Sequence, residues 1–280
     1  MGKETGISWA DATVNFWHGC TKVSQGCKYC YMYRDKKRFG NDGRVITRSA
    51  KQTFYSALKW DEPQKIFTCS MSDFFIKESD EVKDAEGNVI RHWRKDAWEV
   101  IKNTPQHTWM ILTKRPDRIK KCLPDDWGPN GYPNVWIGTS VENQKTANYR
   151  IQKLFEIRCA VRWLSVEPLL EKVDISQFLK VNIADAGKKP DYRFPIHWVV
   201  VGGESGHEPG NEYTYRPCRL EWIHGIVKQC KEQEVPVHVK QLGTSISKSL
   251  ALKARHGDDL DDPYYPMYLK NREWPKITEF

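Results

Sequence analysis

The sequence has no apolar run long enough to cross a membrane, and its N-terminus lacks the apolar core of a signal peptide. It has no low-complexity tract and no short-period repeat. The serine-hydrolase turn G-x-S-x-G and the phosphate-binding loop G-x4-G-K-[ST] are also missing. These absences argue against a membrane protein, a secreted protein and two large enzyme classes. We therefore expect a cytoplasmic protein with no membrane partner.

Cysteine is the residue type with the most informative pattern. Three of the 8 cysteines, Cys20, Cys27 and Cys30, lie within eleven residues as C-x6-C-x2-C. Without a secretion signal, such thiols bind metals or stay free. Thiolates are soft ligands that suit zinc or an iron–sulfur cluster. His18 would complete a structural Cys3His zinc site, whereas three cysteines alone leave an open coordination position on a cluster. We favour the cluster over zinc, and either over three free buried thiols.

Positive charge is in excess, with 44 Lys and Arg against 36 Asp and Glu and a net charge of +8. This balance favours a polyanionic partner such as nucleic acid or a nucleotide. Lysines on solvated helix faces would give the same sum, so the charge alone does not decide between these interpretations.

Seven apolar or β-branched runs predict strands. Several of them, such as WMIL and WVVV, are continuously apolar, which is typical of strands buried on both faces of a parallel sheet. The predicted strands span 12–20, 65–70, 108–113, 135–139, 161–165, 197–201 and 236–240.

Helical patterns fill most of the gaps between these strands, at 44–60, 91–103, 143–155 and 220–233. Regular alternation of strand and helix predicts an α/β fold, a (β/α) TIM-like barrel, complete or partial, of six to seven units with an N-terminal cysteine loop. A doubly wound sheet is the alternative. We expect residues 1–249 to form the barrel domain and 250–280 a C-terminal extension packed on it. Residues 77–90 and 175–195 are expected to be loops.

Charged and polar residues follow the strands, where active sites of α/β barrels are assembled. Carboxylates and cations at one barrel mouth should pair with each other or with a ligand, because isolated charges are costly to desolvate. Salt bridges that merely close the barrel are the structural alternative. The residues concerned are Asp73, Lys114, Arg115, Glu142, Glu167, Glu204 and Lys240.

The segments that carry these residues form an ordered set of motifs from residue 7 to residue 243. They read GCTKVSQGCKYCY, SMSDFF, ILTKRP, GTSVENQ, LSVEPLL, GGESG and VKQLG. This set resembles the phage-associated three-Cys-motif family. That family is similar in turn to radical S-adenosylmethionine enzymes of the spore photoproduct lyase type.

The resemblance implies specific roles for residues of this chain. Cys20, Cys27 and Cys30 would hold a [4Fe–4S] cluster, and S-adenosylmethionine would occupy its open iron. The implied cofactor-binding residues are Tyr29, Ser72, Asp73, Ser140 and Glu142. Lys114, Arg115 and Lys240 would hold a phosphate or carboxylate of the substrate, and Glu167 and Glu204 would orient substrate or cofactor.

The function implied is hydrogen abstraction by a 5′-deoxyadenosyl radical from a nucleic acid or nucleotide. Two features depart from the usual radical-enzyme pattern, namely the x6 spacing and the absence of Gly-Gly-Glu after the second strand. The alternative is a non-catalytic module that binds nucleic acid or a protein partner and has a Cys3His zinc site. Metal-dependent hydrolysis by the carboxylates is a third, weaker hypothesis.

Overall fold

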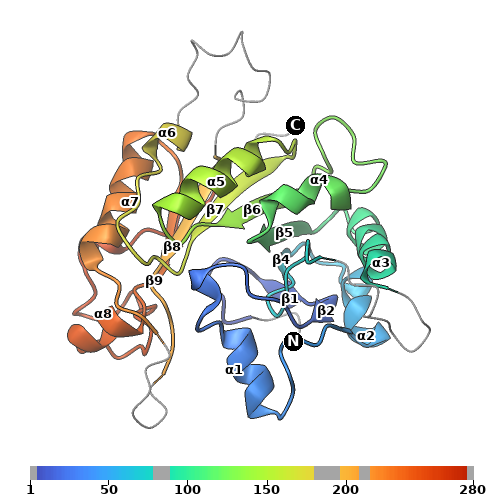
Figure 1. The fold of residues 1–280 in the computed structure, drawn as a ribbon. Helices are drawn as coiled ribbons and strands as arrows, with labels where there is room; N and C mark the ends of the chain where they lie inside the picture. Colours follow the sequence, from blue (N-terminus) through green and yellow to red (C-terminus); the bar gives the residue numbers. More distant parts are fainter. Residues whose placement is uncertain (1–4, 78–88, 180–195, 208–214, 276–280) are drawn as a thin grey trace. The chain divides into compact units, whose positions relative to one another are not determined.

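The structure, a computed structural model, describes residues 5–77, 89–179, 196–207 and 215–275. The chain forms two compact units (Figure 1). The first comprises Met1–Gly138 and Ile157–Ala160, and the second comprises Thr139–Glu156 and Val161–Phe280. No helix among the described residues is long and apolar enough to cross a membrane.

Parallel strands form the centre of each unit. In the first unit the strand order is β1 (Ala12–Val14), β4 (Lys65–Thr68), β5 (Thr108–Thr113) and β6 (Val135–Ser140). In the second unit the order is the end of β6, then β7 (Val161–Val166), β8 (Trp198–Gly202) and β9 (Val237–Gln241). Each predicted strand run overlaps one of these strands, so the prediction of an α/β fold with parallel strands is confirmed. Closure of the strands into a barrel stays a prediction, as does the division at residue 249.

Burial explains why the apolar runs form strands. Every residue of β6, β7 and β8 is buried, as expected for strands covered on both faces. In the first unit, large aromatic side chains pack beside the strands. Phe16 stacks on Trp109 of β5, with ring centroids 5.6 Å apart, and Phe74 contacts Trp98 at 4.9 Å. Phe74 directly follows Asp73, so this core fixes the end of the β4 segment.

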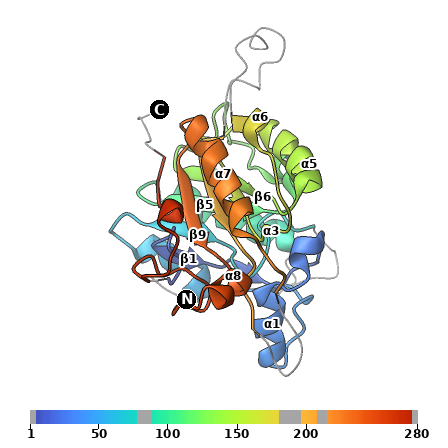
Figure 2. The same ribbon diagram turned by 90° about the vertical axis from the view of Figure 1, so that its left-hand side faces the viewer.

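Three of the predicted helices are confirmed within one or two residues: α3 (Ile90–Lys102), α5 (Gln144–Phe155) and α7 (Leu220–Glu232). In α3, Trp93, Ala97 and Ile101 are buried, which is the i, i+4, i+8 face read from the sequence. Helix α7 packs against β8 and β9 in the second unit (Figure 2). The shorter helices are α1 (Tyr31–Arg38), α2 (Lys51–Phe54), α4 (Ile119–Cys122), α6 (Ser176–Leu179) and α8 (Thr244–Ser249).

The predicted helix at 44–60 is wrong. This segment contains strand β3 (Thr47–Arg48), helix α2 and a 3-10 turn, η2 (Ser56–Lys59). The break occurs at Ser49, whose backbone N donates to Phe16 O and whose Oγ donates to Asn15 O. Three β-branched residues, Val45, Ile46 and Thr47, also favour extended backbone before that point.

The predicted strand at 12–20 is divided in two. Strand β1 pairs with β4 in parallel, whereas β2 (Trp17–His18) pairs with β3 in antiparallel register, with Trp17 opposite Arg48. Asn15 separates them because its side-chain oxygen accepts a hydrogen bond from Met71 N. The predicted loops at 77–90 and 175–195 lie mostly outside the described residues, and α6 occupies part of the second.

Candidate functional site

The three cysteines lie in one loop of the first unit, between β2 and α1. Cys20 comes two residues after β2, Cys27 ends the 3-10 turn η1 (Gln25–Cys27), and Cys30 precedes the first residue of α1. Gly19 sets the position of Cys20, because its φ is +90° and its backbone lies against Val45. An added Cβ there would lie 2.1 Å from Val45 O. Only glycine fits this approach.

The thiols lie in a common electrostatic environment. Burial, followed by the charge that Cys20, Cys30 and Cys27 carry once they ionise at high pH, raises the pKa of Tyr33 to about 12. The Tyr33 hydroxyl donates a hydrogen bond to Cys20 O. Burial is also the main cause that raises the pKa of Cys20 to about 11 and raises that of Cys30. Both groups are therefore protonated thiols at neutral pH, and binding a metal must release their protons.

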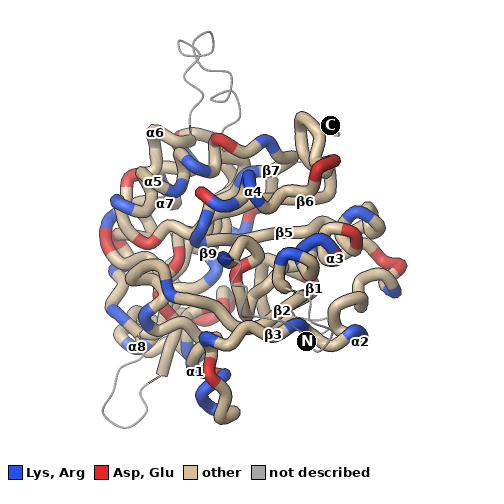
Figure 3. The backbone as a smooth tube through the Cα atoms, turned by 45° about the vertical axis from the view of Figure 1, so that its right-hand side comes forward, with Lys and Arg blue, Asp and Glu red and all other residues tan. Residues whose placement is uncertain are grey.

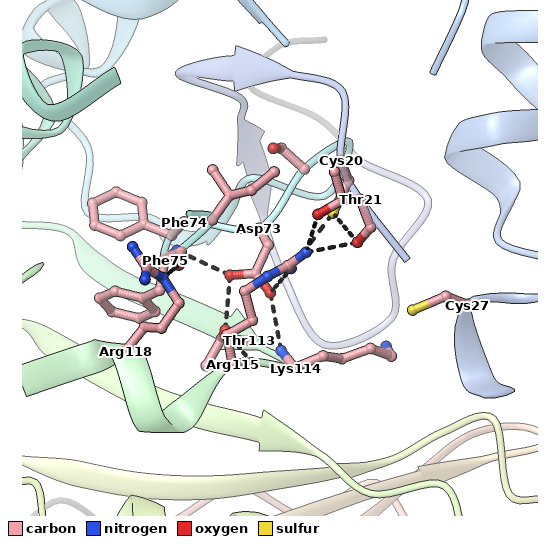
Figure 4. Close-up of polar contacts among 12 residues, drawn as sticks. Cys20, Thr21, Cys27, Asp73, Phe74, Phe75, Thr113, Lys114, Arg115 and Arg118 are labelled. Atoms are coloured by element: carbon pink, nitrogen blue, oxygen red, sulfur yellow. Dashed lines mark hydrogen bonds and ion pairs between the residues drawn. The ribbon is translucent and has the colours of Figure 1, made fainter. Parts of the chain in front are cut away.

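A buried arginine connects the cysteine loop to the ends of two strands (Figure 4). Arg115 follows β5, and its Nη1 donates to Asp73 Oδ2 at 2.9 Å and to Cys20 Sγ at 3.6 Å. Its Nη2 donates to Thr21 O at 2.6 Å and to Thr21 Oγ1 at 2.7 Å. One guanidinium thus fixes the backbone beside Cys20 and supplies positive charge to its sulfur.

Asp73 holds that guanidinium in place. Its Oδ1 accepts from Thr113 Oγ1 at 2.7 Å and from Phe75 N at 2.9 Å, and its Oδ2 accepts from Lys114 N at 3.0 Å as well as from Arg115. A carboxylate offers about four lone-pair positions, and donors of the chain account for that number here. These contacts support a positioning role for Asp73, and its predicted contact with a cofactor stays a prediction.

The other predicted residues of the first unit lie around the same loop. Ser72 Oγ donates to Gly19 O at 2.5 Å. The Lys114 ammonium acts on Cys30, opposing the rise in its pKa caused by burial. Tyr29 lies between Cys27 and Cys30, half-buried, with the Lys28 Nζ 4.9 Å from its ring centroid. Their proposed contacts with cofactor and substrate stay predictions.

The predicted residues of the second unit form three ion pairs. Glu142 pairs with Arg150 at 3.0 Å, and the same guanidinium donates to Ser140 O. Glu204 accepts two donors of the Arg216 side chain, Nε at 2.8 Å and Nη2 at 2.5 Å. Lys240 Nζ lies 3.1 Å from both oxygens of Glu167, which also accepts from Gln241 Nε2 at 2.5 Å.

The five residues of the second unit are therefore engaged with chain partners, as the sequence led us to expect of charges at strand ends. The structure brings Cys20 together with Asp73 and Arg115, and it brings Glu167 together with Lys240. Convergence of the two groups at one mouth stays a prediction. Sequence reasoning missed Thr21, Thr113 and Arg216. The first two lie within quoted motifs, next to Cys20 and Lys114, but Arg216 has no sequence signal.

The donor set fits an iron–sulfur cluster in chemistry, since three thiols of one loop are soft ligands beside two cations. In the part of the chain that the structure describes, no three His, Cys, Asp or Glu side chains are gathered closely enough to hold a metal ion. A cluster would thus require the three sulfurs to come closer together. His18 is the zinc alternative, and burial, with a smaller effect of Lys36, lowers its pKa and favours the neutral, ligating form.

The fold and this site define an α/β protein with a cysteine loop after its first parallel strand. The chain belongs to the family described as protein of unknown function DUF5131, whose model matches residues 4–268. That description leaves the predicted link to phages as a prediction. No curated protein matches the chain significantly. Among solved structures, a spore photoproduct lyase mutant is similar at 14% sequence identity and a TM-score of 0.45. The match covers 72% of this chain and 58% of that chain, so this chain spans less than two thirds of its length.

Proposed function

We propose that this protein is an iron–sulfur enzyme of the radical S-adenosylmethionine kind that acts on a nucleic acid or nucleotide. One observation carries the proposal. Cys20, one of three cysteines in a single loop, lies beside a buried guanidinium that is anchored on the residues following β4 and β5. Ligand sites of parallel α/β proteins lie at these carboxyl ends of strands.

In this proposal Cys20, Cys27 and Cys30 hold a [4Fe–4S] cluster. With S-adenosylmethionine bound, the cluster supplies one-electron chemistry that the amino acids themselves do not provide. The chain's own residues prepare the site. Arg115 offsets thiolate charge at Cys20, Asp73 fixes Arg115, and Lys114 places a cation near Cys30. Tyr29 and Lys114 are proposed to contact adenine and phosphate, respectively.

The test is anaerobic reconstitution of the full chain with iron and sulfide. We expect about four irons per chain, loss of iron in Cys20→Ala, Cys27→Ala and Cys30→Ala, and formation of 5′-deoxyadenosine after S-adenosylmethionine and reductant are added. Cys230→Ala, a buried thiol of α7 in the second unit, is the matched control and should retain iron. A fully loaded chain that forms no 5′-deoxyadenosine would reject the radical step.

A non-catalytic binding module with structural zinc is the second candidate, and the position and neutral form of His18 favour it. Zinc in protein purified without air, lost in His18→Ala together with the folded loop, would support this module. Iron that is retained in His18→Ala would support the enzyme.

A further inference from the structure

Positive charge is concentrated in the segment that carries the cysteine loop. Residues 20–48 contain eight Lys and Arg and two acidic residues, a net charge of +6, whereas the whole chain has +8. One of the acids, Asp42, pairs with Arg44, and Arg48 pairs with Asp96. Most of the remaining positive charge lies in the loop and in helix α1.

Helix α1 presents one end of this charged segment to solvent. Its first turn is held by Tyr31, whose hydroxyl donates to Ser70 O at 2.5 Å, and by the buried Met32. Its last turn carries Lys36, Lys37 and Arg38. Figure 3 shows blue Lys and Arg segments on α1. In the described residues none of these three cations makes an ion pair. Cations at a helix C-terminus also interact favourably with the helix dipole, which is a structural reason for their position. That reason does not account for an aromatic side chain next to them.

An exposed aromatic side chain follows these cations directly. Phe39 is 74% exposed, and the Arg38 guanidinium lies 5.9 Å from its ring centroid. Cations that follow a phosphate backbone, next to an aromatic ring on which a base can stack, are the combination that binds single-stranded nucleic acid.

We propose that Lys36, Lys37, Arg38 and Phe39, here called the α1 end, bind single-stranded nucleic acid. The cations contact consecutive phosphates, and the Phe39 ring stacks on an unpaired base. Duplex DNA does not offer a free base face to such a ring, which is why the single strand is favoured. The inference deepens the proposed function and rests on it for one point only, namely that the bound strand is the substrate delivered to the cysteine loop.

The test is fluorescence-anisotropy titration of a labelled single-stranded oligonucleotide with the full chain at several salt concentrations. The triple variant Lys36→Gln, Lys37→Gln, Arg38→Gln should lower the slope of log affinity against log salt by about 2, as expected for three lost phosphate contacts. The control replaces three exposed lysines outside the charged segment, Lys95→Gln, Lys145→Gln and Lys172→Gln, and has the same net charge. It should leave the slope unchanged.

The stacking contact has its own variant. Phe39→Ala should weaken single-strand binding by about tenfold with little change in the salt slope. Tyr264→Ala, which removes a ring that is 69% exposed in the second unit, should have no effect. Equal effects of the α1-end triple variant and its control, or equal affinity for a duplex of the same sequence, would overturn the inference. So would α1-end-dependent binding to phosphatidylserine vesicles with unchanged oligonucleotide affinity.

Iron content separates this inference from the proposed function. The α1-end variants should load as much iron as the unmodified chain, because none of the four residues contacts a cysteine. A chain that binds single strands through the α1 end but takes up no iron would refute the enzyme and leave the inference standing. An iron-loaded, active chain whose single-strand affinity is unchanged in the α1-end variants would support the enzyme and refute the inference.

Discussion

The side chain of Arg115 donates hydrogen bonds to both Cys20 and Thr21 of the cysteine loop. The Arg115 side chain is 7% exposed, and that of its partner Asp73 is 6% exposed. Arg115 and Thr21, which are hydrogen-bonded, lie 94 residues apart in the sequence. A buried ion pair contributes little compared with an apolar pair of the same size. Removing only one partner is costly, because it leaves an uncompensated charge inside the protein.

Arg115→Met should therefore lower the free energy of unfolding by about 3–5 kcal/mol, since Asp73 is left buried without its cation. Urea unfolding monitored by tryptophan fluorescence measures the change. Asp73→Asn/Arg115→Met should lose less than the sum of the single variants. Arg44→Met removes an arginine from an exposed pair with Asp42 and should change the stability little. Additive effects at Asp73 and Arg115 would show that the two side chains are not coupled.

Gly19 is the second residue on which the loop depends. Gly19→Ala places a Cβ against Val45 O in a backbone conformation that L-residues avoid, so we expect a loss of at least about 1–2 kcal/mol. The matched control is Gly225→Ala in α7, where an added Cβ meets nothing within 4 Å. That change should stabilise the helix by up to about 1 kcal/mol. Equal behaviour of both variants in thermal unfolding would contradict the close approach at Gly19.

Some contacts of the site follow from the sequence, and others do not. Arg115 and Asp73 were identified because they follow apolar runs, a local signal. The pairing of Arg115 with Thr21 and of Glu204 with Arg216 depends on how loops fold back in space. Hydrophobic periodicity in the sequence does not predict which side chains will pair. The sequence likewise does not say which charged residues pair with one another within each unit.

Among the elements, buried strands were the most predictable. The predicted run at 108–113 has the same bounds as β5. A short, continuously apolar segment is typical of a strand that is buried on both faces of a parallel sheet. The segment 44–60 failed because its apolar spacing resembled a helix while Ser49 and Arg48 were fixed by contacts to residues 15–17. Tertiary contacts of this kind override local propensity.

The C-terminal segment forms an isolated antiparallel bridge with β9 in the second unit, between Arg272 and His238. Val239 N donates to Asn271 O, Glu273 N donates to Val237 O, and Trp274 stacks on Trp198 at 4.8 Å. Deletion of residues 271–280 should expose the backbone of β9 and cause concentration-dependent association, measured by light scattering. Deletion of residues 276–280 alone is the control, because it keeps the contacts of residues 271–274 with β8 and β9. A monodisperse longer deletion would show that β9 is protected in another way.

At the scale of the whole molecule, acid should destabilise the protein through buried histidines. Burial, then the charges of Arg272 and Lys240, lowers the pKa of His238 to about 3, and burial also lowers that of His197. The unfolded chain, with a histidine pKa of about 6.5, binds more protons than the folded chain between these values. The stabilising contribution is therefore complete above about pH 6.5 and is lost as pH falls toward 3.

His238→Phe should make the free energy of unfolding less dependent on pH in this window, by at most about 1.4 kcal/mol per pH unit. Urea titrations at pH 7, 6, 5 and 4 measure that slope. His92→Phe changes an exposed histidine of α3 and should leave the slope as it was. An unchanged slope in His238→Phe would mean that this imidazole does not resist protonation in the folded protein.

The backbone around Cys20 is held by contacts within the chain, so the loop should fold before any metal is bound. Gly19, Thr21 and Tyr33 secure that stretch through contacts made entirely by the polypeptide. If the chain holds the proposed cluster, chelator treatment should consequently remove it without unfolding the chain, unlike a zinc finger, whose apo form is unstructured. Far-ultraviolet circular dichroism should be the same before and after stripping. In that case the apoprotein folds first, and iron can be inserted into the folded chain afterwards.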